Sequence, residues 1–139
     1  MGKSDQKLEE AMQVHVMSVK ISQHIDEKIT KLEQYAMMQS KELQISLMDS
    51  VKALNADLFY WRSNLIEVPG MEHEHHHEHT HGYQPLAHLT PEMVLDIQKD
   101  LRNQIIQLNI RTQKLLDTLD NKNENEPIEK KEKASRYGA

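Results

Sequence analysis

The chain contains no cysteine among its 139 residues. This absence excludes disulfide bonds, thiolate zinc sites, iron–sulfur clusters and cysteine nucleophiles, and it leaves the redox compartment open. Aromatic residues are also scarce, at 4% of the chain, with one Phe and one Trp. Apolar residues make up 37%, which is enough for one domain whose modest core is mainly aliphatic and rich in methionine.

An excess of positive charge and long apolar runs are missing as well. The 22 Asp and Glu residues outnumber the 17 Lys and Arg residues, which gives a formal net charge of -5. Because nucleic acids bind basic surface patches, this balance argues against nucleic-acid binding. No stretch approaches the roughly 20 apolar residues that span a bilayer, so we expect no transmembrane segment.

Glycine and proline are absent from residues 3–68. Within this range apolar residues recur every three or four positions, which is the period of an amphipathic helix with nearly heptad spacing. Pro69-Gly70 ends the pattern. The expected stripe consists of Leu8, Met12, Val16, Val19, Ile25, Ile29, Leu32 and Ala36, followed by Leu43, Leu47, Val51, Leu54, Leu58, Trp61 and Leu65.

This first half of the chain has two interpretations. The stripe is weakest at residues 35–40, where Ser40 offers an N-cap, and this predicts two helices at about 5–34 and 40–66. The stripe nevertheless keeps its phase there, which allows one continuous helix of roughly 90 Å. Since a single helix of that length would need partners along its whole length, a hairpin is favoured.

A further helix is predicted at residues 91–119. Thr90-Pro91-Glu92 has the pattern of an N-cap followed by a first helical turn. The apolar stripe of this helix, which Arg111 and Thr112 interrupt, consists of Val94, Ile97, Leu101, Ile105, Leu108, Leu115 and Leu119.

The fold class that follows is all-α, with one helical domain over residues 1–120. We expect long antiparallel helices, arranged as a helical hairpin or a three-helix bundle with coiled-coil-like packing. A His-rich loop over residues 67–89 connects the last two helices. The charged remainder, residues 121–139, is expected to be a disordered tail.

The loop at 67–89 carries the run His-Glu-His-His-His-Glu-His-Thr-His at residues 73–81, with six of the nine histidines. Neutral imidazole is the commonest protein ligand for zinc, nickel and copper(II). Alternate residues of an extended chain share one face, and residues four apart share one face of a helix, so either conformation creates chelating pairs. The predicted ligands are His73, His75, His76, His77, His79 and His81, with Glu72, Glu74 and Glu78 as auxiliary donors and His88 as a nearby addition.

The run favours metal capture or buffering over a defined metal centre. Structural zinc sites hold a few ligands on rigid elements and catalytic sites keep one open position, whereas this run offers many equivalent ligands. Imidazole suits Zn²⁺, Ni²⁺, Co²⁺ and Cu²⁺, and the sequence does not choose among them. Two alternatives stay open: a solvated low-complexity loop that binds metal only incidentally, and a loop that changes charge near pH ~6.5.

The other histidines and the methionines are interpreted as structural. His15 and His24 lie about 180° apart around a helix, so they cannot chelate one ion, and we interpret them as surface or boundary residues. Thioethers are ligands for copper(I), but five methionines have helical spacing and are expected to fill gaps in the core: Met12, Met17, Met37, Met38 and Met48. Only Met71 and Met93 are plausible additional ligands.

No catalytic pattern is present, and we predict that the protein is not an enzyme. The sequence has no Gly-x-Ser-x-Gly motif and no glycine-rich phosphate loop. Residues 73–77 match the letters of the His-Glu-x-x-His motif. They stand beside a Pro-Gly break in low-complexity sequence and not in an amphipathic helix, so a zinc hydrolase is not expected.

Two stretches, 60–70 (YWRSNLIEVPG) and 89–98 (LTPEMVLDIQ), flank the histidine run. Together they resemble small uncharacterised helical proteins of the Bacteroidota cell envelope, often lipoproteins, over about residues 58–100. The shared pattern is an aromatic-ended helix, a Val-Pro-Gly turn, a variable His-rich linker and a helix capped by Thr-Pro-Glu. The resemblance implies a periplasmic or envelope location and a removed lipidated cysteine, and it supplies no known activity. A cytoplasmic location stays open.

The sequence therefore predicts a non-enzymatic helical protein that captures or buffers a divalent transition metal such as zinc, nickel or copper. The alternative is a structural or protein-interaction module whose helical stripes bind another helix, or a second copy in a homodimer, with the His-rich loop incidental.

Overall fold

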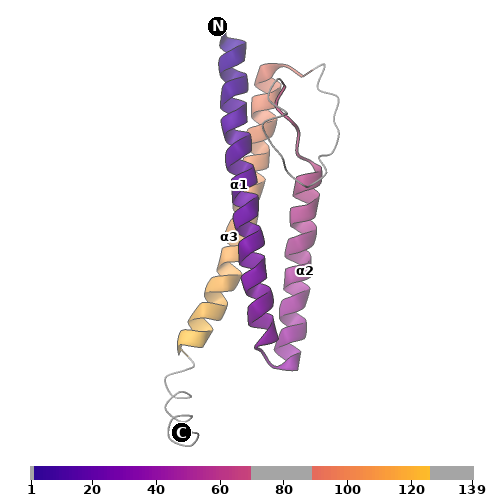
Figure 1. Cartoon of the computed structure of the whole chain (residues 1–139), viewed down its shortest axis with the longest axis vertical. Coiled ribbons are helices and arrows are strands. Elements are labelled where there is room, and N and C mark those ends of the chain that lie inside the picture. The colour runs from indigo at the N-terminus through magenta and orange to yellow at the C-terminus, as the bar shows by residue number, and fades with distance from the viewer. Residues whose placement is uncertain (1, 70–88, 126–139) are drawn as a thin grey trace, which may run out of the picture.

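The computed structural model of the chain describes residues 2–69 and 89–125, which form three helices (Figure 1). The helices are α1 (Lys3–Met37), α2 (Lys41–Ser63) and α3 (Pro91–Asn125). The described residues contain no strand. The all-α prediction is confirmed, although α2 ends three residues earlier than expected and α3 continues six residues beyond the predicted end at 119.

The first half of the chain is a hairpin and not one long helix. The last turn of α1 tightens, because Met38 N–H donates to Tyr35 C=O at 3.1 Å and Gln39 N–H donates to Ala36 C=O at 3.1 Å. Ser40 occupies the N-cap position of α2, as predicted, but its side chain makes no capping hydrogen bond.

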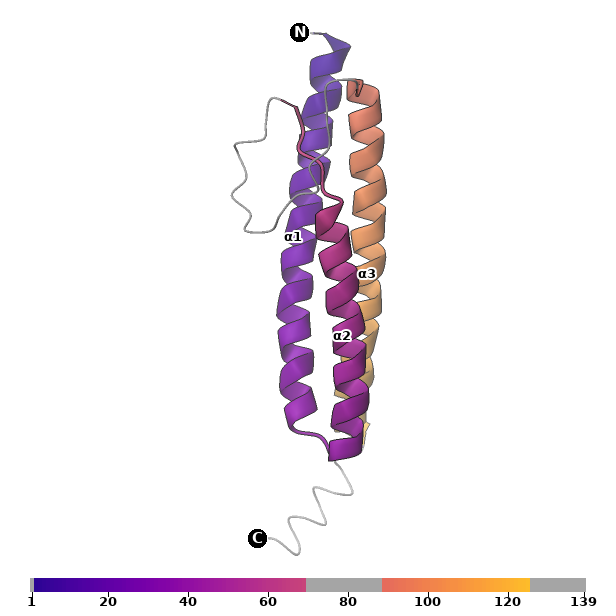
Figure 2. The ribbon, with the colours of Figure 1, turned by 90° about the vertical axis from the view of Figure 1, so that its right-hand side faces the viewer.

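Helix α1 packs along both other helices, most extensively along α3, whereas α2 and α3 contact each other sparsely. α1 and α3 run in the same direction, with α2 antiparallel to both (Figures 1 and 2). Cross-helix pairs along α1 and α3 keep a nearly constant register: Lys7 with Glu92 at 3.5 Å, Lys28 with Asn109 at 2.7 Å, and Tyr35 with Asp120.

The core is aliphatic, as expected, and consists of two clusters. The larger one runs along all three helices and contains Ile25, Leu32, Leu58, Trp61, Leu65 and Ile105 among its most buried members. The smaller one joins the first turns of α1 to the beginning of α3 and contains Ala11, Met12, Val14, Val68, Val94 and Leu95.

The predicted stripe is wrong at several positions. Val16 and Leu43, expected in the core, are 44% and 46% exposed. Polar residues take core positions instead: His15, Ser18, Ser22 and Thr112 are buried. Each of the three buried hydroxyls donates to a main-chain carbonyl three or four residues earlier, for example Thr112 Oγ1 to Leu108 C=O at 2.8 Å. Because these hydroxyls are hydrogen-bonded within their own helices, they can be buried despite their polarity.

The prediction that the methionines fill the core is also largely wrong. Met12 is buried and Met48 is half-buried, but Met17, Met37 and Met38 are exposed. The last two are the final residue of α1 and its C-cap, beside the turn to α2. Met93 is exposed on the first turn of α3, and Met71 lies outside the described residues.

Tyr35 and Asp120 provide a test of the α1–α3 register. The Tyr35 hydroxyl donates to the Asp120 carboxylate, and this hydrogen bond, with desolvation and the carboxylate's charge, raises the pKa of Tyr35. The bond is therefore intact below the ordinary tyrosine pKa of about 10 and is lost as the pH rises through the higher pKa of the folded state.

We expect alkaline titration at 295 nm, taken as wild type minus Tyr35→Phe, to show one tyrosine that ionises later than the ordinary value. Asp120→Asn removes the charge of the acceptor and should move this transition toward lower pH. Superimposable curves for wild type and Asp120→Asn would contradict the described register.

Candidate metal-binding segment and its anchored flanks

The predicted metal ligands all lie outside the described residues. This applies to the six ligands of the histidine run, to the three auxiliary glutamates and to His88, which fall within residues 70–88. What the structure describes is how the two ends of this segment are held, at Pro69 and at Leu89.

The first flank leaves the end of α2 and is fixed against the bundle. Trp61 Nε1–H donates to the main-chain carbonyl of Leu101 on α3 at 2.8 Å, which ties the last turn of α2 to α3. Beyond α2, Leu65 and Val68 are almost completely buried, the first in the larger core cluster and the second in the smaller one. Residues 64–69 are therefore a packed stem, although they are not helical.

A buried glutamine holds the main chain of this stem. Gln98 on α3 is fully buried, and its Nε2 donates to the Ile66 carbonyl at 2.7 Å. Since a carbonyl can only accept, this bond assigns the Gln98 amide orientation and directs Oε1 toward His15 Nδ1, 3.2 Å away. The His15 ring then carries its proton on Nδ1 as the donor of this bond.

The second flank is the capped beginning of α3. Thr90 Oγ1 accepts a hydrogen bond from Met93 N–H at 3.1 Å, and Pro91 occupies the first helical position, as predicted. Leu89, just before the cap, packs against the smaller core cluster, which also contains Val68. Both ends of segment 70–88 are thus held against one hydrophobic cluster.

The two histidines among the described residues, His15 and His24, lie in different surroundings. His15 is fully buried, which corrects its interpretation as a surface or boundary residue: the polar partner Gln98 lies 83 residues away and compensates for burial. His24 is exposed, with its ring 3.7 Å from the Glu27 carboxylate. Within residues 2–69 and 89–125, no group of three or more His, Asp or Glu side chains could hold a metal ion.

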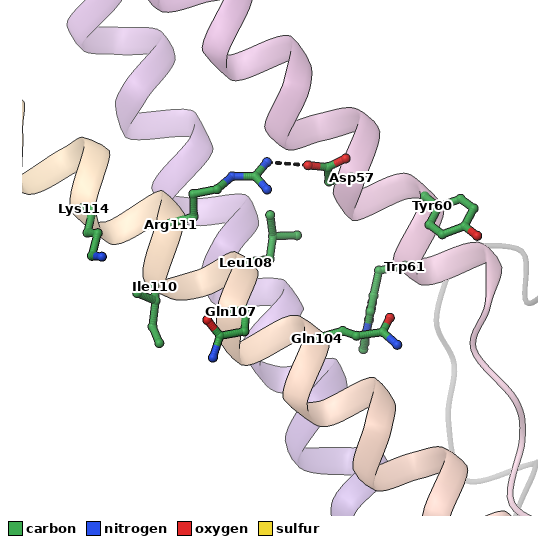
Figure 3. A pocket seen from close by; sticks show the side chains of 9 residues that line it. All are labelled: Asp57, Tyr60, Trp61, Gln104, Gln107, Leu108, Ile110, Arg111 and Lys114. Atoms are coloured by element: carbon green, nitrogen blue, oxygen red, sulfur yellow. Dashed lines mark hydrogen bonds and ion pairs between the residues drawn. The ribbon is translucent and has the colours of Figure 1, made fainter.

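A groove lies between α2 and α3, and the sequence did not predict it (Figure 3). Two cavities of about 570 and 400 Å³ lie along it, and both are lined by Arg111 and Lys114. Arg111 forms an ion pair with Asp57 across the groove. The sequence indicated Arg111 only as an interruption of the α3 stripe, and nothing in it pairs two residues 54 positions apart.

Comparisons with known proteins add no family or relative: no protein-family model, no curated protein and no solved structure matches the sequence. The resemblance to envelope proteins stays a prediction. None of the described helices is both long and apolar enough to cross a membrane.

Gln98→Leu tests the anchoring of the stem. The substitution removes the donor to the buried Ile66 carbonyl and the acceptor for His15 Nδ1, and each buried polar group that loses its partner costs about 1–3 kcal/mol. We expect the free energy of unfolding, measured by urea denaturation, to fall by at least ~2 kcal/mol.

The matched control is Gln23→Leu at an exposed position of α1, which should change the same quantity by less than about 0.5 kcal/mol. The double variant His15→Leu/Gln98→Leu removes both members of the pair and should be less destabilised than the sum of the two single variants. Equal stability of Gln98→Leu and Gln23→Leu would rule out the anchoring role.

Proposed function

We propose that this protein captures or buffers a divalent transition metal through its histidine-rich segment. The observation that carries the proposal is the sequence of residues 72–81, which contains six of the chain's nine histidines together with three glutamates and one threonine. Imidazole nitrogens and carboxylate oxygens are ligands for Zn²⁺, Ni²⁺ and Cu²⁺. The protein would supply binding and no catalysis.

The anchored flanks support this proposal. Val68 and Leu89 pack on one cluster, so the two ends of the segment start from fixed positions at one end of the bundle. Fixing the backbone of one residue costs about 1–2 kcal/mol of conformational entropy, and this cost opposes binding. Flanks that are already packed reduce the number of residues that a bound ion has to order.

Binding of this kind is expected to depend on pH. A metal binds the neutral imidazole, whose ordinary pKa is about 6.5, so protons compete with the ion below that pH. The adjacent glutamates Glu72, Glu74 and Glu78 attract both the protons and the metal. Metal binding is therefore still expected to weaken as the pH falls.

Calorimetric titration with Zn²⁺, Ni²⁺ and Cu²⁺ tests the proposal. We expect a dissociation constant tighter than about 10 μM at pH 7.5, equivalent to more than about 7 kcal/mol, and much weaker binding at pH 5.5. A variant with His73, His75, His76, His77, His79 and His81 changed to Ala should lose this binding and keep the helical content and thermal midpoint of the wild type.

The matched control is His24→Ala, which removes an exposed imidazole from α1 and should leave affinity and stoichiometry unchanged. A wild-type dissociation constant weaker than about 10 μM for all three ions would favour an incidental histidine-rich segment over metal capture. Binding that survives the six-histidine variant would place the ligands elsewhere.

A second candidate function is that of a helical interaction module, and the groove between α2 and α3 favours it. Two helices that pack on α1 but only sparsely on each other leave a groove between them, whose lining includes side chains of the core. The metal-binding and interaction functions use different parts of the chain, so one does not exclude the other.

A further inference from the structure

The groove between α2 and α3 has the shape of an unfilled helix position. α1 packs against both helices and fills one side of the space between them, while no other helix of residues 2–69 and 89–125 fills the opposite side. In a four-helix bundle the helices occupy the four corners of a square in cross-section, and α1, α2 and α3 occupy three such corners. The groove lies at the fourth corner, and it is lined on α3 from Gln104 to Thr118, a length of about 21 Å or four helical turns.

The floor of this groove is apolar and rigid. Leu54, Trp61 and Leu108 contribute their side chains to it, although each is almost completely buried. The hydrogen bond from Trp61 Nε1 to the Leu101 carbonyl holds the indole in place. Ser50 and Ala53 line the α2 side and are small enough to let another backbone approach closely.

The rim carries side chains that are enriched at protein interfaces. Tyr60 is 70% exposed beside Trp61, and Arg111 extends across the groove (Figure 3). Trp, Tyr and Arg are the residue types that most often dominate binding energy at interfaces. The composition of this rim is therefore typical of a surface that binds a protein partner.

The charge of the rim selects the partner. Arg111 and Lys114 line both cavities, and Asp57 is the one carboxylate among the described residues that lines either. These residues make the groove locally positive in a chain of net charge -5. The Arg111–Asp57 pair is about half exposed, at 54% and 53%. An exposed pair contributes at most about 1 kcal/mol, so a carboxylate of a partner can replace Asp57 as the acceptor.

From this geometry we propose that the groove between α2 and α3 binds an amphipathic helix of another protein, with its apolar face on Leu54, Trp61 and Leu108 and with acidic residues at Arg111 and Lys114. This is recognition of a helix in a groove. It is independent of the proposed metal binding, because none of the groove residues belongs to the histidine-rich segment.

A second copy of this chain fits the groove less well. Stable dimers bury about 800 Å² on each partner, whereas a groove of four turns presents a footprint of roughly 20 by 10 Å. That footprint suits one short helix. Two copies with their grooves facing each other would also repel, because Arg111 and Lys114 make the rim of each groove positive.

Two labelled 18-residue helical peptides without tryptophan serve as probes, one with a leucine face flanked by glutamates and one with the same face flanked by lysines. Fluorescence anisotropy in the presence of EDTA, which excludes any contribution of bound metal, measures their affinities. We expect the acidic peptide to bind wild type about tenfold more tightly than the basic one, and about tenfold more tightly than it binds Arg111→Glu/Lys114→Glu. The double variant should prefer the basic peptide.

The matched control is Lys20→Glu/Lys52→Glu, which makes the same change in net charge at exposed positions outside the groove. It should weaken the acidic peptide less than about twofold. Emission from Trp61, the chain's only tryptophan, should change on binding and so locate the peptide at the groove.

Three results would overturn the proposal. Equal affinity for the two peptides would exclude selection by charge, and equal weakening by both double variants would exclude the groove as the binding site. A concentration-dependent dimer in sedimentation that Arg111→Glu/Lys114→Glu abolishes would identify a second copy as the occupant. None of these results bears on metal affinity, which the histidine variants measure separately.

Discussion

The burial of one face of α1 is the constraint on which the rest of the structure depends. α1 has 35 residues and α2 has 23, lengths of about 52 and 35 Å, so α2 leaves about 18 Å of α1 uncovered. Residues 64–69 continue the chain beyond the end of α2, and Val68 packs in the cluster that contains Ala11, Met12 and Val14 of α1. Leu65 and Val68 are buried beyond the end of α2, and the stem of the histidine-rich segment is held for this reason.

The same length difference explains the buried polar residues at this end. The main chain of the non-helical stem does not make the regular hydrogen bonds of a helix, and buried main-chain groups need other partners. The side chain of Gln98 donates such a hydrogen bond to the Ile66 carbonyl. Gln98 in turn accepts from His15, so α1, α3 and the stem meet at one point. A polar pair inside an otherwise apolar seam also specifies register, as polar core residues do in coiled coils. The anchoring of the segment and the alignment of α1 with α3 thus share one interaction.

The two proposed functions occupy separate parts of the molecule. Metal capture would use a segment whose flanks are fixed at one end of the bundle, while helix binding would use the side of the bundle between α2 and α3. The groove exists because α2 and α3 each pack on α1 more extensively than on each other. Since the contact between α2 and α3 is sparse, Trp61 and Leu108 line a groove as well as the core.

The sequence by itself determined the helices, the break at Ser40, the Thr90 cap and the concentration of histidines, because periodicity, capping and composition act over neighbouring residues. It also indicated most of the aliphatic core. The tertiary structure alone decided that His15 and Thr112 are buried while Val16 and Leu43 are exposed. It also paired Asp57 with Arg111 across the groove. The physical reason is that burial depends on which helix lies opposite, and hydrogen-bond partners more than 80 residues apart leave no local pattern.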